Sequence, residues 1–403
     1  MTILESVSLR ADWKTQRLDS LFTRSFEANS GELEPLSVFT DVGVVPRSSR
    51  DHSYKALGAD LDKNLRVRKG DLVFNKLRTW QGAIGLSAFD GIVSPAYFVL
   101  RPHAGIEARY YHYLLRSTPW IQELRRVSKY MPPNQNDISW DDLKRIEVPT
   151  PRLEDQRRIA DFLDKETKRI DDLIVSKRRL IEVLKDRTES MVATMIDPVQ
   201  TRFGEVPLKS VAHLRVSNVD KKSVEGETPV LLCNYTDVYY NRKIDMSIEF
   251  MAATADGPQI ARLTLKQNDV LITKDSETAD DIGVPALVVS ECPTVVLGYH
   301  LALLRPYKVD GSYLYWVLMS RATRDRFALA ASGVTRFGLR QDSIASLPVP
   351  IPPLELQREI ASKLDRDQTA IDKAIEQLVA QIVLLQERRQ ALITAAVTGQ
   401  LEI

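Results

Sequence analysis

A stretch of 24 residues occurs twice in this chain. Residues 148–171 and 349–372 align without a gap, and 13 of the 24 aligned pairs are identical. Unrelated sequences match at far fewer positions, so the stretch marks an internal duplication, which constrains the fold more than any single motif does. The 403 residues are therefore expected to form two related units rather than one.

Each copy begins with prolines and continues with the pattern of a long helix. Pro149 and Pro151 restrict the backbone before them, so we expect the first helix to begin near Leu153 and to end at Asp197-Pro198. Apolar residues recur in heptad steps. These seam residues are Ile159, Leu163, Ile170, Leu173, Leu180, Leu184 and Met191 in the first copy, and Ile360, Leu364, Ile371, Leu378, Leu385 and Leu392 in the second. One such helix cannot bury its seam alone, so we expect the two to pair as an antiparallel coiled coil.

Mixed α and β patterns precede each long helix. In the first half, residues 36–45, 72–76 and 92–100 are strand-like, and residues 108–127 are helical. The second half echoes this plan at residues 268–274, 300–306 and 312–320. We therefore predict an α+β fold with two α/β domains in tandem, each followed by a long helix, and pseudo-two-fold symmetry. The predicted boundaries are 1–150 and 199–350 for the domains, and 151–198 and 351–403 for the helices.

Composition and charge restrict the function only weakly. The chain has 55 basic and 54 acidic residues, and a balanced total can still hide a local basic surface. The two cysteines, Cys233 and Cys292, form no disulfide framework or zinc spacing, so we expect thiols in a reducing compartment. The N-terminus lacks the pattern of a secretory signal, and no apolar run is long enough for a membrane span. A soluble cytoplasmic protein is the expectation.

The duplicated segment resembles the two repeats of Type I restriction-modification specificity subunits. Residues 70–85, 268–283 and 335–353 also resemble segments of the two target recognition domains of that family. The resemblance covers essentially the whole chain. It implies a non-catalytic DNA specificity subunit in which each target recognition domain reads one half of an interrupted double-stranded DNA target.

The same resemblance implies partners. The paired helices would fix the spacing between half-sites and dock two methyltransferase subunits, which in turn bind restriction-translocase subunits. No cofactor is implied in this chain, because S-adenosylmethionine, ATP and Mg would belong to the partner subunits. No membrane partner is implied.

Catalytic motifs are missing from the sequence. The nearest string to the Asn-Pro-Pro-aromatic motif of adenine methyltransferases is Met131-Pro132-Pro133-Asn134, and no glycine-rich cofactor or phosphate loop occurs. Asp71 and Asp269, each five residues before a lysine, could belong to a nuclease site, but a turn aspartate before a strand is the simpler interpretation. A stand-alone methyltransferase or nuclease and a coiled-coil scaffold without a DNA role are the alternative hypotheses.

Candidate DNA contacts are the polar loop residues that can reach base edges and phosphates. They are Arg47, Arg50, Lys76, Arg78, Gln81, Asn134 and Gln135 in the first domain, and Asn234, Tyr235, Arg242, Lys274, Ser276, Arg336 and Arg340 in the second. Lys76 and Lys274 are favoured because they recur before loops that differ. For each candidate the alternative is a solvated loop residue, and Trp80 is a candidate for packing under its loop.

A second set of candidates lies beside the proline entry of each helix. Gln156-Arg157 and Gln357-Arg358 recur at equivalent positions. They are candidate contacts for the methyltransferase subunits. Hydrogen bonding at the start of the helix is the alternative role.

Overall fold

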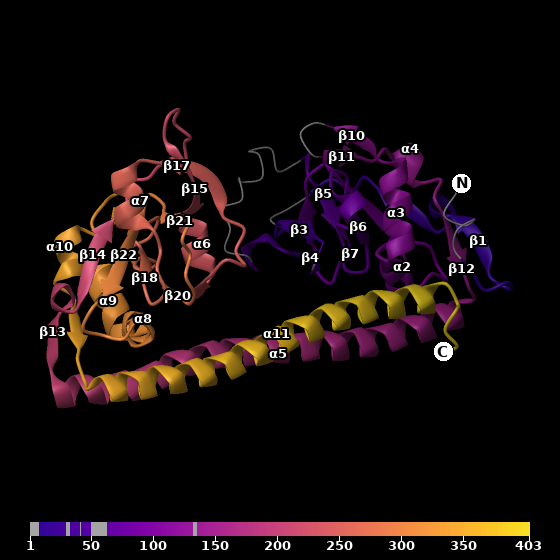
Figure 1. Cartoon of the computed structure of the whole chain (residues 1–403). Coiled ribbons are helices and arrows are strands. Elements are labelled where there is room, and N and C mark those ends of the chain that lie inside the picture. The colour runs from indigo at the N-terminus through magenta and orange to yellow at the C-terminus, as the bar shows by residue number, and fades with distance from the viewer. Residues whose placement is uncertain (1–7, 30–32, 41, 50–62, 132–134) are drawn as a thin grey trace. The chain divides into compact units, whose positions relative to one another are not determined.

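The computed structural model describes residues 8–29, 33–40, 42–49, 63–131 and 135–403 (Figure 1). The chain divides into two compact units, one formed by Met1–Lys177 with Val379–Ile403 and the other by Arg178–Leu378. Among the described helices, none has both the length and the apolar character that crossing a membrane requires.

Unit 1 contains a mixed domain and part of each long helix. Its elements are β1 (Lys14–Arg17), η1 (Leu18–Ser20), β2 (Phe22–Ser25), β3 (Leu36–Phe39), β4 (Gly43–Pro46), η2 (Arg47–Ser49), β5 (Leu65–Val67), β6 (Leu72–Asn75), η4 (Thr79–Gln81), β7 (Ile84–Leu86), β8 (Gly91–Val93), β9 (Tyr97–Pro102), α2 (Ala108–Leu115), α3 (Thr118–Val127), β10 (Lys129–Met131), β11 (Gln135–Asp137), α4 (Trp140–Leu143), β12 (Glu147–Thr150), the start of α5 (Leu153–Phe203) and the end of α11 (Leu354–Val397).

Unit 2 repeats this plan with additional strands and helices. Its elements are β13 (Glu205–Pro207), η5 (Leu208–Ser210), β14 (Ala212–Val216), β15 (Thr228–Cys233), α6 (Tyr235–Tyr240), β16 (Lys243–Ile244), β17 (Met251–Ala255), α7 (Gly257–Leu263), β18 (Val270–Thr273), β19 (Asp275–Ser276), β20 (Pro285–Val288), β21 (Val295–Leu297), β22 (Leu301–Pro306), α8 (Gly311–Met319), α9 (Arg321–Ala330), β23 (Phe337–Gly338), α10 (Gln341–Ala345), β24 (Pro348–Pro350), the end of α5 and the start of α11.

Corresponding strands form the main sheet of each unit. The order is β2-β9-β6-β7 in unit 1 and β14-β22-β18-β20-β16 in unit 2, so β9 and β6 match β22 and β18. In both units a short strand near the start pairs antiparallel with the proline-rich strand before the long helix, as β1 with β12 and β13 with β24. The repeat found in the sequence is therefore a repeat of topology as well.

Both faces of each main sheet are buried. Along β18, Val270 and Ile272 join the core that includes the helices, whereas Leu271 joins a second core under β15, β17 and β21. Successive side chains of a strand point to opposite faces, so an almost continuous apolar run fills both cores. Cys233 and Cys292 are unpaired thiols buried in the second of these cores.

The long helices pair antiparallel within each unit (Figure 1). In unit 1, Leu163 of α5 packs in the same core as Ile393 and Val397 of α11. In unit 2, Ile196 of α5 packs in the same core as Leu364 of α11. The first helix begins at Leu153, as predicted.

The structure corrects four details of the sequence-based fold. Residues 36–45 form the hairpin β3–β4, in which Gly43 has a positive φ of 74°, rather than one strand. Residues 92–100 divide between β8 and β9, and residues 108–127 form two helices, with Pro119 in the first turn of the second. The first long helix continues through Pro198 to Phe203.

Packing explains why Pro198 does not end its helix. The proline removes one backbone hydrogen bond, a loss of about 3 kcal/mol in a helix interior. Ile196 and Val199, on either side of it, are buried in the core of unit 2. The helix ends instead at Gly204, whose φ of 72° is a common helix terminator.

The seam lies one residue away from the predicted positions in the middle of the first helix. Leu173 and Leu180, at 44% and 46%, are exposed, whereas the next residues, Ile174 and Ile181, are buried and half-buried. Nearer the domains, the predicted seam residues are buried, as at Ile159, Leu163, Ile360 and Leu364.

Candidate nucleic-acid interface

An aspartate immediately before β6 and before β18 is buried against an arginine. Asp71 accepts two hydrogen bonds of 3.2 Å from Arg101, and Asp269 accepts bonds of 2.8 and 2.7 Å from Arg305. Each carboxylate also accepts the backbone N–H three residues earlier, at 2.9 and 2.8 Å. These aspartates organise their turns, as the simpler interpretation expects.

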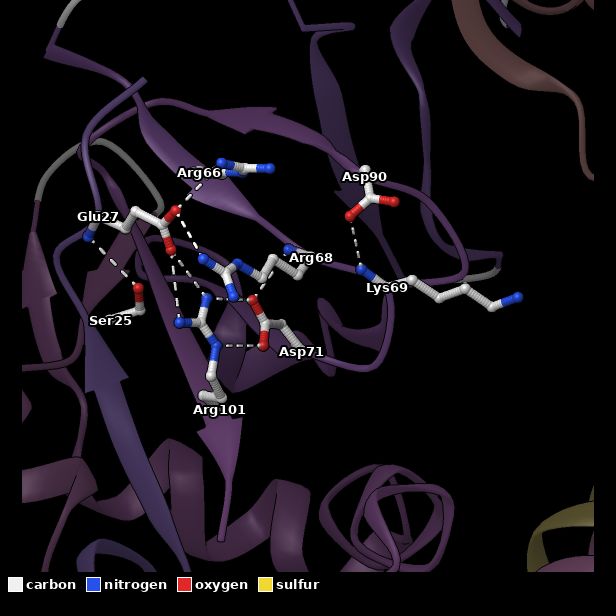
Figure 2. Close-up of polar contacts among 8 residues, drawn as sticks. All are labelled: Ser25, Glu27, Arg66, Arg68, Lys69, Asp71, Asp90 and Arg101. Atoms are coloured by element: carbon white, nitrogen blue, oxygen red, sulfur yellow. Dashed lines mark hydrogen bonds and ion pairs between the residues drawn. The ribbon is translucent and has the colours of Figure 1, made fainter. Parts of the chain in front are cut away.

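A second acid joins this arrangement in unit 1, as Figure 2 shows. Glu27 accepts hydrogen bonds from Arg68 at 2.9 Å, Arg66 at 3.2 Å and Arg101 at 3.4 Å. The hydrogen bond from Arg68 is the main reason that the pKa of Glu27 is lowered. Three guanidinium groups thus face the two carboxylates of Glu27 and Asp71, which leaves this cluster with a net positive charge.

The candidate residues of unit 1 gather beyond the end of β6. The carbonyl of Lys76 accepts the N–H of Ile138 at 3.4 Å, so the end of the β10–β11 hairpin lies beside it. The Lys76 ammonium lies 5.2 Å from the centre of the Phe98 ring. Arg78 and Gln81 are exposed in the following loop.

Tyr97 lies at the same edge, where the charges of two candidate arginines act on its hydroxyl group. Burial raises the pKa of Tyr97, and the positive charges of Arg47 and Arg78 act in the opposite direction. The Nε of Arg47 also donates to Ser37 Oγ at 2.9 Å.

The remaining candidates of unit 1 are only partly described. Arg50 and Asn134 lie outside the described residues, and Gln135 begins β11. The indole N–H of Trp80 donates to the carbonyl of Leu77 at 3.1 Å, and Arg125 lies 5.4 Å from its ring centre. Trp80 therefore packs under its loop, which confirms that alternative.

The candidates of unit 2 gather at the equivalent edge. Lys274 follows β18, and its carbonyl accepts the N–H of Leu339 at 2.9 Å, so the loop before α10 lies beside it. Ser276 in β19 pairs with Phe337 in β23. Arg336 and Arg340, in the same loop, are exposed.

Tyr235 lies next to this edge. Its ring stacks on that of Tyr239 with centroids 5.5 Å apart. Burial is the main cause that raises the pKa of Tyr235, while a hydrogen bond to Ser276 and the charge of Arg336 oppose the rise. The structure therefore brings Tyr235, Ser276 and Arg336 together.

Two candidates of unit 2 have other roles. Asn234 is buried and caps α6, and it forms a reciprocal capping box with Asp237. Arg242 forms an ion pair with Asp372 of α11, beside a cavity of about 330 Å³. Polar groups of both residues are thus engaged within the chain, and the DNA contacts expected of them stay predictions.

The two glutamines at the proline entries join each helix to its domain. Gln156 and Gln357 are each 1% exposed. In both, the side-chain N–H group donates to the carbonyl of the proline five residues earlier at 2.8 Å. The amide oxygen accepts the N–H of Glu107 at 3.0 Å or of Asp310 at 2.8 Å. The hydrogen-bonding alternative is confirmed, and these amides present no face to a partner subunit.

The neighbouring arginines remain at the surface. Arg157 and Arg358 are both exposed, and the Nε of Arg358 lies 3.8 Å from the carboxylate of Asp310. They occupy equivalent positions in the two units.

One residue at the edge of unit 2 had no signal in the sequence. The Nδ1–H of His300 donates to the Asp275 carboxylate at 2.6 Å, although 25 residues separate the two. The spacing of the five histidines gave no reason to select it. Among the described residues, no group of three or more His, Cys, Asp or Glu side chains is placed to hold a metal ion.

The chain thus has two α/β domains in tandem, each followed by a long helix and each with polar loop residues at one edge of its main sheet. The family model of the Type I restriction modification DNA specificity domain matches residues 10–183 and 205–381, and the chain belongs to this family. It is accordingly a Type I restriction-modification DNA specificity subunit with two recognition domains.

Individual relatives agree with this assignment. A Methanocaldococcus jannaschii protein described as the MjaX specificity subunit of a type I restriction enzyme is 23% identical over 360 residues, which cover 84% of this chain and 80% of the relative. The MjaVIII specificity subunit of the same organism is 21% identical over 282 residues, covering 64% and 63%.

Solved structures share the fold at low sequence identity. One, from a study of complex assembly and conformational transition of the type I R-M system, is 18% identical with a TM-score of 0.71, covering 98% of this chain and 100% of that chain. The HsdS subunit from Thermoanaerobacter tengcongensis is also 18% identical, with a TM-score of 0.56 and 98% of each chain covered.

Proposed function

We propose that each recognition domain of this chain reads one half of an interrupted double-stranded DNA target. The first domain would be residues 1–150 and the second residues 199–350. The helices 151–198 and 351–403 would fix the separation between the half-sites and dock two methyltransferase subunits, which bind restriction-translocase subunits. The chain itself would be non-catalytic and cytoplasmic, and S-adenosylmethionine, ATP and Mg would be bound by its partners.

The observation that carries this proposal is a shared scaffold with two different edges. Lys76 and Lys274 follow equivalent strands, and a later loop lies beside each of them. The side chains that come next differ, with Arg78 and Gln81 in one unit and Asp275 and Ser276 in the other. Arg and Gln pair with purine edges, whereas Asp275 is engaged by Lys274 and His300 and Ser276 is buried. Two different half-sites are the simplest use of such a pair.

Docking on the helices is supported by side chains that the chain leaves uncovered. In the part of the helix pair that belongs to unit 1, Leu173, Val175, Val379, Val383 and Leu384 are exposed apolar residues. Exposed apolar surface on a helix pair suits another helical protein. Arg157 and Arg358, at equivalent entry positions, suit two copies of one partner.

Replacing residues 204–350 with the corresponding domain of another specificity subunit tests independent reading. The exchange begins at Gly204 and ends with β24, so that the strand pair β13–β24 moves as a whole. Methylation by the complex should change in one half of its target, and the other half should stay as it was. New bases in both halves would contradict separate reading by the two domains.

Seven residues inserted into both helices test the spacing role. Suitable sites follow Lys177 and Leu378, where the two units divide. Each insertion adds about 10 Å of helix, which corresponds to at most about three base pairs of DNA at 3.4 Å per step. The spacer should change while both half-site sequences persist. An insertion in one helix alone is the control, because it shifts the pairing of the seams.

A further inference from the structure

His300 and Asp275 form an oriented pair at the edge of unit 2. The imidazole Nδ1 lies 2.6 Å from a carboxylate oxygen of Asp275, and the same carboxylate lies 3.1 Å from the Lys274 ammonium. The ring also packs edge-on against Tyr299, with centroids 4.1 Å apart. Within the described part of the chain, no hydrogen-bond partner engages Nε2 of this ring. The imidazole is thus held by one hydrogen bond and one ring contact, while its Nε2 remains available.

The backbone at His300 is left-handed. Its φ is 72°, a region that is uncommon for residues other than Gly, although Asn, Asp and His adopt it more often than other types. Asn268 is the other described residue of this kind, and its φ of 75° has a structural explanation, because its side-chain oxygen accepts the N–H of Gly311 at 3.0 Å. At His300, the side-chain hydrogen bond that the structure describes is the one to Asp275. Residues held in this region gather where a side chain must be presented for function.

The pair is absent from unit 1. The N–H of Lys76 donates to the carbonyl of Ala96 at 3.1 Å, and the N–H of Lys274 donates to that of His300 at 2.8 Å. His300 therefore occupies the place of Ala96, and Asp275 occupies that of Leu77. The first unit forms the equivalent backbone hydrogen bond with neither side chain, so this bond does not depend on them.

We infer that His300, oriented by Asp275, is a specificity-determining residue that reads a base of the half-site assigned to the second recognition domain. This inference rests on the proposed function. A carboxylate that accepts the Nδ1 proton selects the tautomer whose Nε2 is an acceptor. The partner of such an acceptor is the exocyclic amino group of adenine or cytosine, which the major groove exposes.

The decisive variant is His300→Gly. Glycine adopts a positive φ without strain, so the variant should be at least as stable as the natural protein while it loses the imidazole. The full chain with its methyltransferase partner would be tested on duplexes in which each base pair of the target, known from methylome sequencing, is changed in turn. Discrimination should fall about 5- to 150-fold at one base pair of the second half-site. Asp275→Ala should weaken discrimination at that same base pair.

A matched control and a modified base complete the test. His103→Ala removes an exposed histidine of unit 1 that bonds to Thr23 at 2.7 Å, and it should leave the second half-site unaffected. A duplex that lacks the amino group at the identified base should weaken binding by the natural protein, but not by His300→Gly. Uniform loss over all sequences, with a smaller salt dependence, would indicate a phosphate contact and overturn the inference.

Different results would contradict the proposed function and the inference about His300. If the natural complex showed no sequence preference, the proposed function would be wrong. If the natural complex were specific and His300→Gly retained full discrimination, only the inference about His300 would be wrong.

Discussion

The joints between domain and helix are alike in the two units, whereas the edges beyond β6 and β18 differ. At the joints, Gln156 and Gln357 make the same two hydrogen bonds at nearly the same distances. At the edges, Ala96 stands where the other unit has His300. A buried polar group that loses its partner destabilises the fold, and an exposed side chain that changes does not. After a duplication, the joints are therefore constrained and the edges are available for new contacts.

The buried aspartates test this comparison with the largest expected effect. Asp269→Ala leaves the charge of Arg305 without its partner, and breaking such a buried pair reduces the free energy of unfolding by about 3–5 kcal/mol. Asp71→Ala should reduce it less, because the Arg101 side chain is more exposed, at 35% against 17%, and also contacts Glu27. Hydrogen exchange of the β6 and β18 amides would measure each unit separately. A larger loss for Asp71→Ala would contradict this order.

The joint glutamines should give smaller and nearly equal effects. Leucine at position 156 or 357 leaves a backbone N–H and a carbonyl unpaired in a buried site, which reduces the free energy of unfolding by about 2–4 kcal/mol. The two losses should agree within about 0.5 kcal/mol, because the bonds match. Arg157→Ala and Arg358→Ala are the controls, since exposed side chains contribute little. Unequal losses at the two joints would show that the copies have diverged energetically.

One titratable group of unit 1, His112 in α2, has no counterpart in unit 2. Burial lowers the pKa of His112 to about 3, and the charges of Arg116 and Arg389 act in the same direction. Unit 2 has Tyr315 at this position of its helix. Because the unfolded chain binds a proton near pH 6.5 and the folded chain does not, stability is fully present above pH 6.5 and decreases as the pH falls towards 3.

Unit 1 should therefore lose stability in mild acid. Unit 2 lacks a histidine at this position and should not lose stability for this reason. The slope for one group is about 1.4 kcal/mol per pH unit, so the loss between pH 6.5 and 5 should be at most about 2 kcal/mol. Denaturant unfolding over this range, followed by hydrogen exchange in each unit, would measure it. His112→Asn keeps an acceptor for the N–H of Leu86 and should remove the dependence. Equal acid sensitivity in that variant would exclude His112 as the cause.

The joints were largely predictable from the sequence, and the edges were not. The proline entry restricted the backbone so strongly that the start of α5 at Leu153 followed directly. The prediction that the first long helix ends at Pro198 was wrong, because the preference of proline for helix ends takes no account of the core that buries Ile196 and Val199. Leu173 and Leu180 were wrong as seam residues because each is followed by an isoleucine, Ile174 and Ile181, and the apolar pattern alone did not decide which of the two neighbours faces the other helix.

Loop residues were harder because their roles depend on distant partners. Asn234 was selected as a base reader, yet the aspartate three residues later makes it a helix cap. Arg242 is a candidate because of its charge, and its partner Asp372 lies far along the chain in α11. His300 was overlooked because its orienting carboxylate is 25 residues away. No local pattern encodes such pairs, whereas equivalent positions in a repeat can reveal them.

The exposed edges should give the smallest effects on stability. Arg78→Ala and Arg336→Ala each remove an exposed side chain, so the free energy of unfolding should change by no more than about 0.5 kcal/mol. Their effect should appear in DNA recognition by the complex with its methyltransferase partner, with Arg78→Ala altering one half-site and Arg336→Ala the other. Binding of duplexes with one half-site scrambled separates the two. If either variant weakened recognition of both half-sites equally, the edges would serve as a shared phosphate-binding surface, and the contrast between conserved joints and independent edges would no longer hold.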